Sequence, residues 1–69
     1  RQDMHIVLNG SDREIPENLS AGALLQNLGL ADKRLALEIN QEIVPRSNFA
    51  SRMLRAGDRV EIVQAIGGG

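Results

Sequence analysis

The chain has 69 residues, of which 42% are apolar and 25% are charged, and it contains no cysteine. Because a typical domain has roughly 150 residues, this chain is one small domain or part of one, and a two-domain enzyme with its own active-site cleft is excluded. The composition is ordinary for a globular protein, which excludes wholesale disorder. Without cysteine, a disulfide framework, a thiolate metal site and a cysteine nucleophile are also excluded.

Charge and hydropathy argue against two kinds of partner. Eight Lys and Arg face nine Asp and Glu, which gives a formal net charge of −1, and Phe49 is the single aromatic residue. A nucleic-acid-binding surface needs a basic excess or stacking aromatic side chains. The apolar runs are far shorter than the roughly 20 residues that span a bilayer, and no signal-peptide pattern opens the chain. We therefore expect a cytoplasmic protein that binds neither nucleic acid nor membranes.

The first part of the chain predicts a β-hairpin. Apolar residues alternate over residues 4–8, which predicts a strand with one face on a core. Asn9 and Gly10 predict a type I′ turn, because both central positions of that turn need a positive φ. A second strand is expected through residues 13–15, and Pro16 is expected to end it.

A short helix is predicted next. Apolar residues recur at helical spacing along one stripe, at Ala21, Leu24, Leu25 and Leu28. The hydroxyl of Ser20 can cap the first turn, and Gly29 can end the helix in the left-handed conformation. Gly22 weakens the helix by up to about 1 kcal/mol, so its stability must come from docking on a sheet. We expect Leu25 and Leu28 to be buried.

The second half predicts three more strands. The expected order is a strand over 35–39, a turn at 40–41, a short edge strand over 42–44, an ambiguous segment over 47–54 and a last strand over 59–63. In the ambiguous segment a helical turn could bury Phe49 and Leu54. One helix against one mixed sheet of four or five strands is the two-layer α+β solution for a chain of this length.

The usual catalytic groups are missing from the sequence. His5 is the single histidine, it falls on the outward face of the first predicted strand, and no second imidazole or thiol can join it around a metal. The carboxylates are spread singly over turns and outward faces, so no paired acid and base is visible. We predict no catalytic residue and no metal ligand.

The three glycines at residues 67–69 stand out instead. At an average glycine frequency of about 7%, three in a row at a given place are expected about three or four times in ten thousand. Glycine has no Cβ, so Gly67 and Gly68 would form a slender, flexible arm that carries the Gly69 carboxylate into another protein's active site. Extended residues 66–69 reach about 13 Å. A disordered terminus or an added sequence is the alternative reading from composition alone.

Three segments carry a resemblance to a known family. Residues 4–10, residues 37–46 with their Ile-Val-Pro-Arg sequence, and residues 56–69 with the terminal glycines closely resemble the ThiS family of bacterial sulfur carriers in thiamine biosynthesis. The resemblance implies a ubiquitin-like β-grasp fold and a carrier without catalytic side chains or a bound cofactor. It also implies that an E1-like enzyme, ThiF, adenylates the Gly69 carboxylate with ATP and magnesium. A sulfur donor such as a cysteine desulfurase would then allow a thiocarboxylate to form, and its sulfur would pass to thiazole synthase, ThiG.

The domain boundaries and the docking surface follow from this interpretation. We expect a domain over residues 4–66, a flexible tail over 67–69, and residues 1–3 left by processing or added. Val7, Val63, Ala65 and Ile66 are either an apolar patch for partner docking or scattered surface residues. Arg46, Arg52, Arg55 and Arg59 either steer acidic partners or are simply solvated.

Three other functions fit a small chain with this tail. The small subunit of molybdopterin synthase shares the fold, the terminal glycines and the thiocarboxylate chemistry. A ubiquitin-like modifier would join its terminus to a lysine. A plain β-grasp interaction domain would carry an inert tail.

Overall fold

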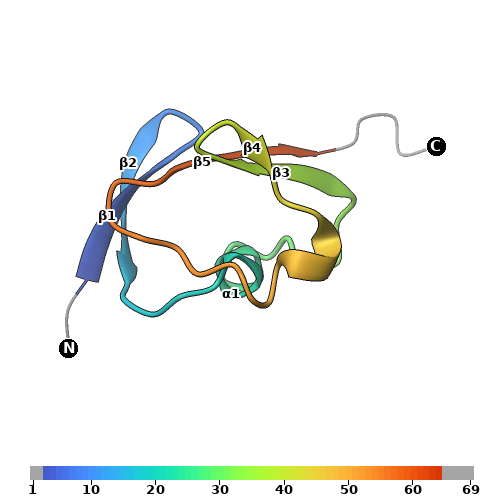
Figure 1. The fold of residues 1–69 in the computed structure, drawn as a ribbon, viewed down its shortest axis with the longest axis horizontal. Coiled ribbons are helices and arrows are strands. Elements are labelled where there is room, and N and C mark those ends of the chain that lie inside the picture. The colour runs from blue at the N-terminus through green and yellow to red at the C-terminus, as the bar shows by residue number, and fades with distance from the viewer. Residues whose placement is uncertain (1–2, 65–69) are drawn as a thin grey trace.

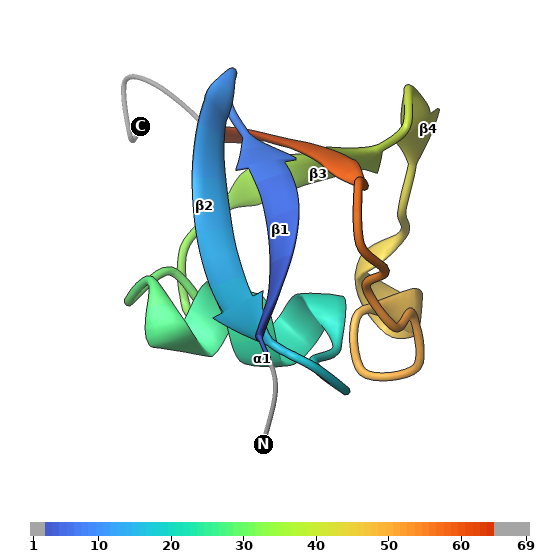
Figure 2. The ribbon, with the colours of Figure 1, turned by 90° about the vertical axis from the view of Figure 1, so that its left-hand side faces the viewer.

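The computed structural model describes residues 3–64 as one helix packed on one face of a five-stranded sheet (Figures 1 and 2). The elements are β1 (Asp3–Leu8), β2 (Ser11–Pro16), α1 (Ala21–Asn27), β3 (Leu35–Ile39), β4 (Glu42–Ile43), the 3₁₀ turn η1 (Arg46–Asn48) and β5 (Arg59–Gln64). Within this part of the chain, no helix has the length and apolar character needed to cross a membrane.

The sheet is mixed, with strand order β2-β1-β5-β3-β4. β1 runs antiparallel to β2 and parallel to β5, while β3 runs antiparallel to both β5 and β4. The last strand of the chain therefore lies at the centre of the sheet, between the first hairpin and the second. This arrangement confirms the predicted α+β class and resolves the strand number as five.

The first hairpin forms as its sequence predicts. Asn9 and Gly10 have φ values of 49° and 84°, so both turn positions are in the left-handed region. The strands pair from Leu8 opposite Ser11 to Asp3 opposite Pro16, where β2 ends. The hairpin confirms the predicted turn, which Asn and Gly adopt more readily than other residues.

Helix α1 is capped at both ends by the predicted residues. The Oγ atom of Ser20 accepts a hydrogen bond of 3.0 Å from the N–H of Ala23. At the other end Gly29 has φ 75°, and the N–H of Leu30 donates to the carbonyl of Leu25 at 2.8 Å. Together with the bond from Gly29 N–H to Gln26 O, this is a Schellman ending.

One packing prediction for the helix is wrong. Leu25 is buried with 2% of its surface exposed, but Leu28 is only half-buried at the edge of the core. Leu28 is the C-cap of α1, so its side chain lies at the end of the helix, where solvent reaches part of it.

A single core lies between α1 and the inner face of the sheet. Its buried members are Ile6, Ile15, Ala21, Leu24, Leu25, Leu37, Ile39, Val44, Phe49, Leu54 and Val60. Phe49 and Leu54 are 9% and 4% exposed, which confirms that the segment after β4 folds back over the core. A helical turn does form here, but η1 begins at Arg46, one residue before the expected segment, and ends at Asn48; it lies beside α1.

The second hairpin needs an unusual backbone at two non-glycine residues. Asn40 and Gln41 have φ values of 54° and 70°, so the turn repeats the geometry of the first hairpin without its glycine. β4 is two residues long and lies at the edge of the sheet, as predicted. Val44, expected in this strand, follows it as a buried core residue.

Candidate functional site

The predicted site residues fall partly inside and partly outside the described part of the chain. Ala65, Ile66 and the glycines at 67–69 lie outside residues 3–64. Val7 and Val63 share the sheet face away from the helix, since their neighbours Ile6 and Val60 point into the core. Val7 pairs with Arg59, four residues before Val63 and so about 13 Å along β5. The structure therefore does not bring the two valines side by side.

Strand β5 ends at Gln64, three residues before the first of the three terminal glycines in the sequence, and its anchoring fixes the last part of the chain that the structure describes. On one side β3 pairs with β5 from Ile39 opposite Val60 to Leu35 opposite Gln64. On the other side β1 pairs only at Arg59 and Val60.

Asn9 extends the short β1 side of this pairing. Its backbone N–H donates to the carbonyl of Val60 at 2.8 Å, and its side-chain Oδ1 accepts from the N–H of Ile62 at 2.8 Å. The Oδ1 atom thus takes the place that the backbone carbonyl of Asn9 would occupy if β1 continued through this residue. It gives Ile62 a partner that the hairpin turn would otherwise remove.

Asn40 holds the opposite side of β5 in the same way. Its N–H donates to the carbonyl of Arg59 at 2.8 Å, and its Oδ1 accepts from the N–H of Arg59 at 3.0 Å. Its Nδ2 group donates to Oδ1 of Asp58 at 3.0 Å. Two asparagines from two hairpin turns therefore fix the start of the last strand from both sides.

Asp58 is the buried charge beside this strand. It is 6% exposed, and its Oδ2 accepts from the N–H of Arg55 at 2.8 Å. The Nη1 atom of Arg52 lies 3.8 Å from the same oxygen, and Arg52 also donates to the carbonyl of Met53. Buried carboxylates need such partners, so Arg52 is the ion-pair partner of Asp58 as well as a surface charge.

Sequence reasoning missed Asn9, Asn40 and Asp58 as the residues that anchor β5. The available signal was an asparagine at the first left-handed position of each predicted hairpin turn, together with an Asp directly before the last strand. The partners lie too far away along the chain for periodicity to identify them.

The outer face of the sheet is acidic. By strand alternation its charged residues are Asp3, Asp12, Glu14, Glu38, Glu61, His5 and Arg59. Glu38 and Glu61 are directly opposite each other on β3 and β5. His5 is exposed, as predicted, and its Nε2 atom lies 3.8 Å from Glu14 Oε2. This face therefore favours a partner with cationic side chains.

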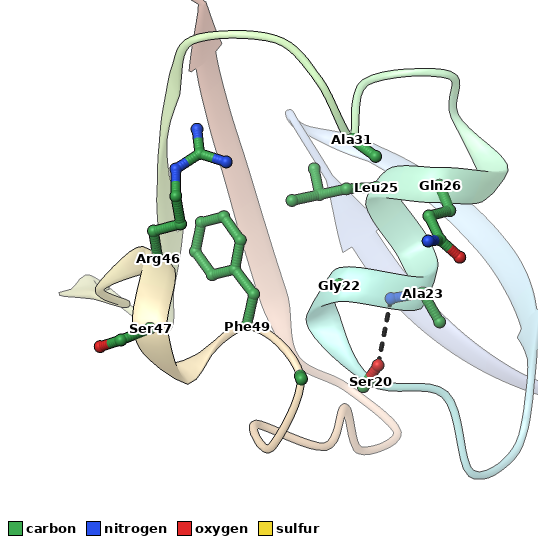
Figure 3. A pocket seen from close by; sticks show the side chains of 10 residues that line it. Ser20, Gly22, Ala23, Leu25, Gln26, Ala31, Arg46, Ser47 and Phe49 are labelled. Atoms are coloured by element: carbon green, nitrogen blue, oxygen red, sulfur yellow. Dashed lines mark hydrogen bonds between the residues drawn. The ribbon is translucent and has the colours of Figure 1, made fainter.

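A groove of about 410 Å³ opens on the other side, between α1 and η1 (Figure 3). The N–H of Gly22 donates to the carbonyl of Phe49 at 2.9 Å, which joins the helix to this loop. The guanidinium of Arg46 lies 5.6 Å from the centre of the Phe49 ring and donates to the carbonyl of Lys33 at 3.1 Å. No carboxylate or histidine lines this groove.

Among residues 3–64, no three His, Cys, Asp or Glu side chains gather in a way that could hold a metal ion.

Comparison with known proteins decides the family. The model of the ThiS family matches residues 6–69, which is nearly the whole chain and includes the three glycines. The chain belongs to the ThiS family. The sulfur carrier protein ThiS of Escherichia coli is 33% identical over 66 residues, which cover 96% of this chain and 100% of that protein.

A solved structure of the ThiS family supports the fold. The crystal structure of the thiamine biosynthesis protein ThiS from Geobacter metallireducens matches with a TM-score of 0.82 and 30% identity, over 96% of this chain and 100% of that one. This match confirms the predicted ubiquitin-like β-grasp fold.

Two of the relatives, both thiazole synthases, are much longer than this ThiS-family chain. A thiazole synthase of Paramagnetospirillum magneticum is 42% identical over 66 residues, which cover 96% of this chain. The chain spans only about a fifth of the length of that protein, since the match covers 20% of it.

Proposed function

We propose that this chain carries sulfur for thiamine biosynthesis as a thiocarboxylate on Gly69. The observation that carries the proposal is the ThiS family match, which extends through the glycines to residue 69. The full-length similarity to a protein named sulfur carrier ThiS supports the same role. The absence of cysteine fits as well, because a carrier without a thiol must hold its sulfur elsewhere.

The proposed chemistry takes place at the terminal carboxylate. A carboxylate is a poor electrophile, so one of its oxygens first attacks the α-phosphorus of ATP and pyrophosphate leaves. A sulfur nucleophile then attacks the acyl adenylate and displaces AMP. Sulfide would give the thiocarboxylate directly, whereas the persulfide of a cysteine desulfurase would give an acyl disulfide, whose S–S bond a thiol then cleaves, leaving the thiocarboxylate and a disulfide between that thiol and the donor. This chain supplies the carboxylate and no catalytic side chain. It acts as a carrier and not as an enzyme, and ATP and magnesium are used by its activating partner.

The proposed partners follow from this sequence of steps. Adenylation requires an E1-like enzyme such as ThiF, and the sulfur requires a donor such as a cysteine desulfurase. A thiazole synthase is the proposed acceptor, because a relative of that name contains a segment 42% identical to this chain. Since ATP is consumed, we place the reaction in the cytoplasm.

Intact-mass measurement tests the proposal. A protein that ends at Gly69 is incubated with the E1-like enzyme, ATP, magnesium and a sulfur donor, with a sample lacking ATP as the control. We expect the mass to rise by the difference between sulfur and oxygen only when ATP is present. An inert domain would keep its mass, and a ubiquitin-like modifier would gain the mass of a target protein.

Transfer to the acceptor distinguishes the second sulfur-carrying candidate. The thiocarboxylate form is mixed with thiazole synthase and its other substrates, and we expect sulfur to appear in the thiazole product. A carrier for molybdopterin synthase would form the same thiocarboxylate and fail in this second step.

A further inference from the structure

The two edges of β5 are paired over different lengths. β3 pairs with β5 as far as Gln64, whereas β1 pairs only at Arg59 and Val60, and Asn9 adds one bond to Ile62. Among residues 3–64, no strand lies along this side of β5 beyond Asn9. The last strand is thus a central strand at its start and an edge strand at its end.

The direction of the backbone groups defines what this edge offers. The carbonyl of Val60 and the N–H of Ile62 both bond to Asn9, so they point toward the β1 side. In a strand, the groups of residues two apart point the same way. The carbonyl of Ile62 and both backbone groups of Gln64 therefore point toward the side where no strand is paired.

We propose that an extended segment of the adenylating enzyme adds to this edge as a strand. The proposal rests on the proposed function, in which that enzyme acts on Gly69. Gly69 is five residues beyond Gln64, so even a fully extended chain separates them by at most about 18 Å. The enzyme surface around its active site must therefore come close to this edge. Exposed strand edges bind extended segments through main-chain hydrogen bonds.

Side chains beside the edge define the chemistry of the added segment. Val63 is 64% exposed on the outer face, so an apolar side chain of the partner can pack against it. Glu61 lies on the same face and is directly opposite Glu38. A Lys or Arg on the added strand would relieve the repulsion between these two carboxylates. The added segment should therefore carry both an apolar residue and a Lys or Arg among the side chains that it places on the outer face of the sheet.

A proline at position 64 tests the added strand. Gln64→Pro removes the N–H that points to the free edge, and no bond to β3 is lost because that N–H points away from β3. Gln64→Ala is the matched reference, since it removes the side chain and keeps the N–H. Thermal unfolding of both variants checks that they fold. We expect the enzyme to bind Gln64→Pro about tenfold more weakly than Gln64→Ala, measured as KM in ATP–pyrophosphate exchange.

Hydrogen exchange of the unmodified protein gives an independent readout. The amide of Gln64 should exchange rapidly in the free chain and become protected in the complex with the adenylating enzyme. Equal KM values for the two variants, or an unprotected Gln64 amide in the complex, would overturn the added strand. Protection of the Gln64 amide in the free protein at high concentration would mean that a second copy of this chain occupies the edge. Protection only in the presence of thiazole synthase would mean that the acceptor occupies it. Either result rejects the adenylating enzyme as the partner at this edge. Failure of the unmodified protein to support exchange would instead contradict the proposed function.

Discussion

The side-chain Oδ1 atom of Asn9 lies 2.8 Å from the backbone nitrogen of Ile62, 53 residues later in the chain. A turn residue thereby continues a β-ladder after its own strand has ended. The contact joins the first hairpin to the strand that precedes the tail. Its geometry depends on the positive φ of Asn9, which turns the backbone back while the side chain stays beside β5.

Replacing Asn9 tests this contact. Asn9→Gly keeps the positive φ and removes the acceptor, so we expect the free energy of unfolding to fall by about 0.5–1.5 kcal/mol. Hydrogen exchange at Ile62 should accelerate more than exchange elsewhere in β5. Asn9→Asp retains an oxygen at the same place and should keep most of the protection. Equal exchange at Ile62 in all three proteins would show that the contact does not form in solution.

Among residues 3–64, Gln41 is the non-glycine residue with the largest positive φ, at 70°. A left-handed conformation costs a residue with a Cβ about 1–2 kcal/mol, and glycine avoids this cost while losing more entropy on folding. We therefore expect Gln41→Gly to raise the free energy of unfolding by about 0.5–1 kcal/mol in denaturant titrations. Gln41→Ala keeps the strained backbone and is the control, expected within about 0.5 kcal/mol of the original protein. A glycine variant less stable than the alanine variant would contradict the argument.

Features determined by neighbouring residues were predicted from the sequence. The turn at Asn9, the cap at Ser20 and the helix ending at Gly29 each depend on a few consecutive residues whose conformational preferences are strong. Alternation also identified the inner faces of the strands, because a strand presents one face to the core whatever its neighbours are.

Contacts between distant segments were not predictable in this way. Alternation does not say which strand lies beside β5, so the bonds from Asn9 and Asn40 to that strand were missed. Leu28 was misjudged because a helical stripe shows which side of the helix faces the core but not how deeply a residue at the end of the helix is buried. From the sequence, Gly22 was interpreted only as a residue that weakens the helix. In the structure its N–H donates to the carbonyl of Phe49, in the segment after β4.

Asp58 tests how strongly the polar anchor supports the fold. Asp58→Ala leaves the N–H of Arg55 and the Nδ2 group of Asn40 without their acceptors in a region that is 6% exposed at Asp58. We expect a loss of about 2–4 kcal/mol in the free energy of unfolding. Asp12→Ala, at an exposed position of β2, should change it by less than about 0.5 kcal/mol. Similar denaturation midpoints for the two variants would show that the buried contacts contribute little.

Leu25 and Leu28 allow the effect of burial on stability to be measured apart from a residue's place on the apolar stripe. Both belong to the same apolar stripe, but Leu25 is 2% exposed and Leu28 is only half-buried. Leu25→Ala should cost about 2–5 kcal/mol, which is comparable to the whole stability of a domain of this size, and Leu28→Ala should cost clearly less. Circular dichroism during thermal unfolding measures both. Equal effects would contradict the exposure difference in the structure.

Changes in the tail should separate activation from folding. Gly68→Val adds a branched side chain to the glycine segment, and deletion of Gly69 shortens the chain by about 3.4 Å when it is extended. Since a misplacement of about 1 Å at a reacting group can cost about 10²-fold in rate, both changes should lower adenylation at least that far. The thermal midpoint should hardly move, because both changes leave every core residue among residues 3–64 in place.

Pyrophosphate exchange with the E1-like enzyme measures the adenylation step for these tail variants. His5→Ala is the matched control, since His5 is exposed on the outer face of β1, and its exchange rate should equal that of the original protein. Exchange at the original rate after deletion of Gly69 would refute the terminal-carboxylate mechanism, because the reacting group would then have moved without consequence. Loss of exchange together with loss of folding would instead assign the tail a structural role.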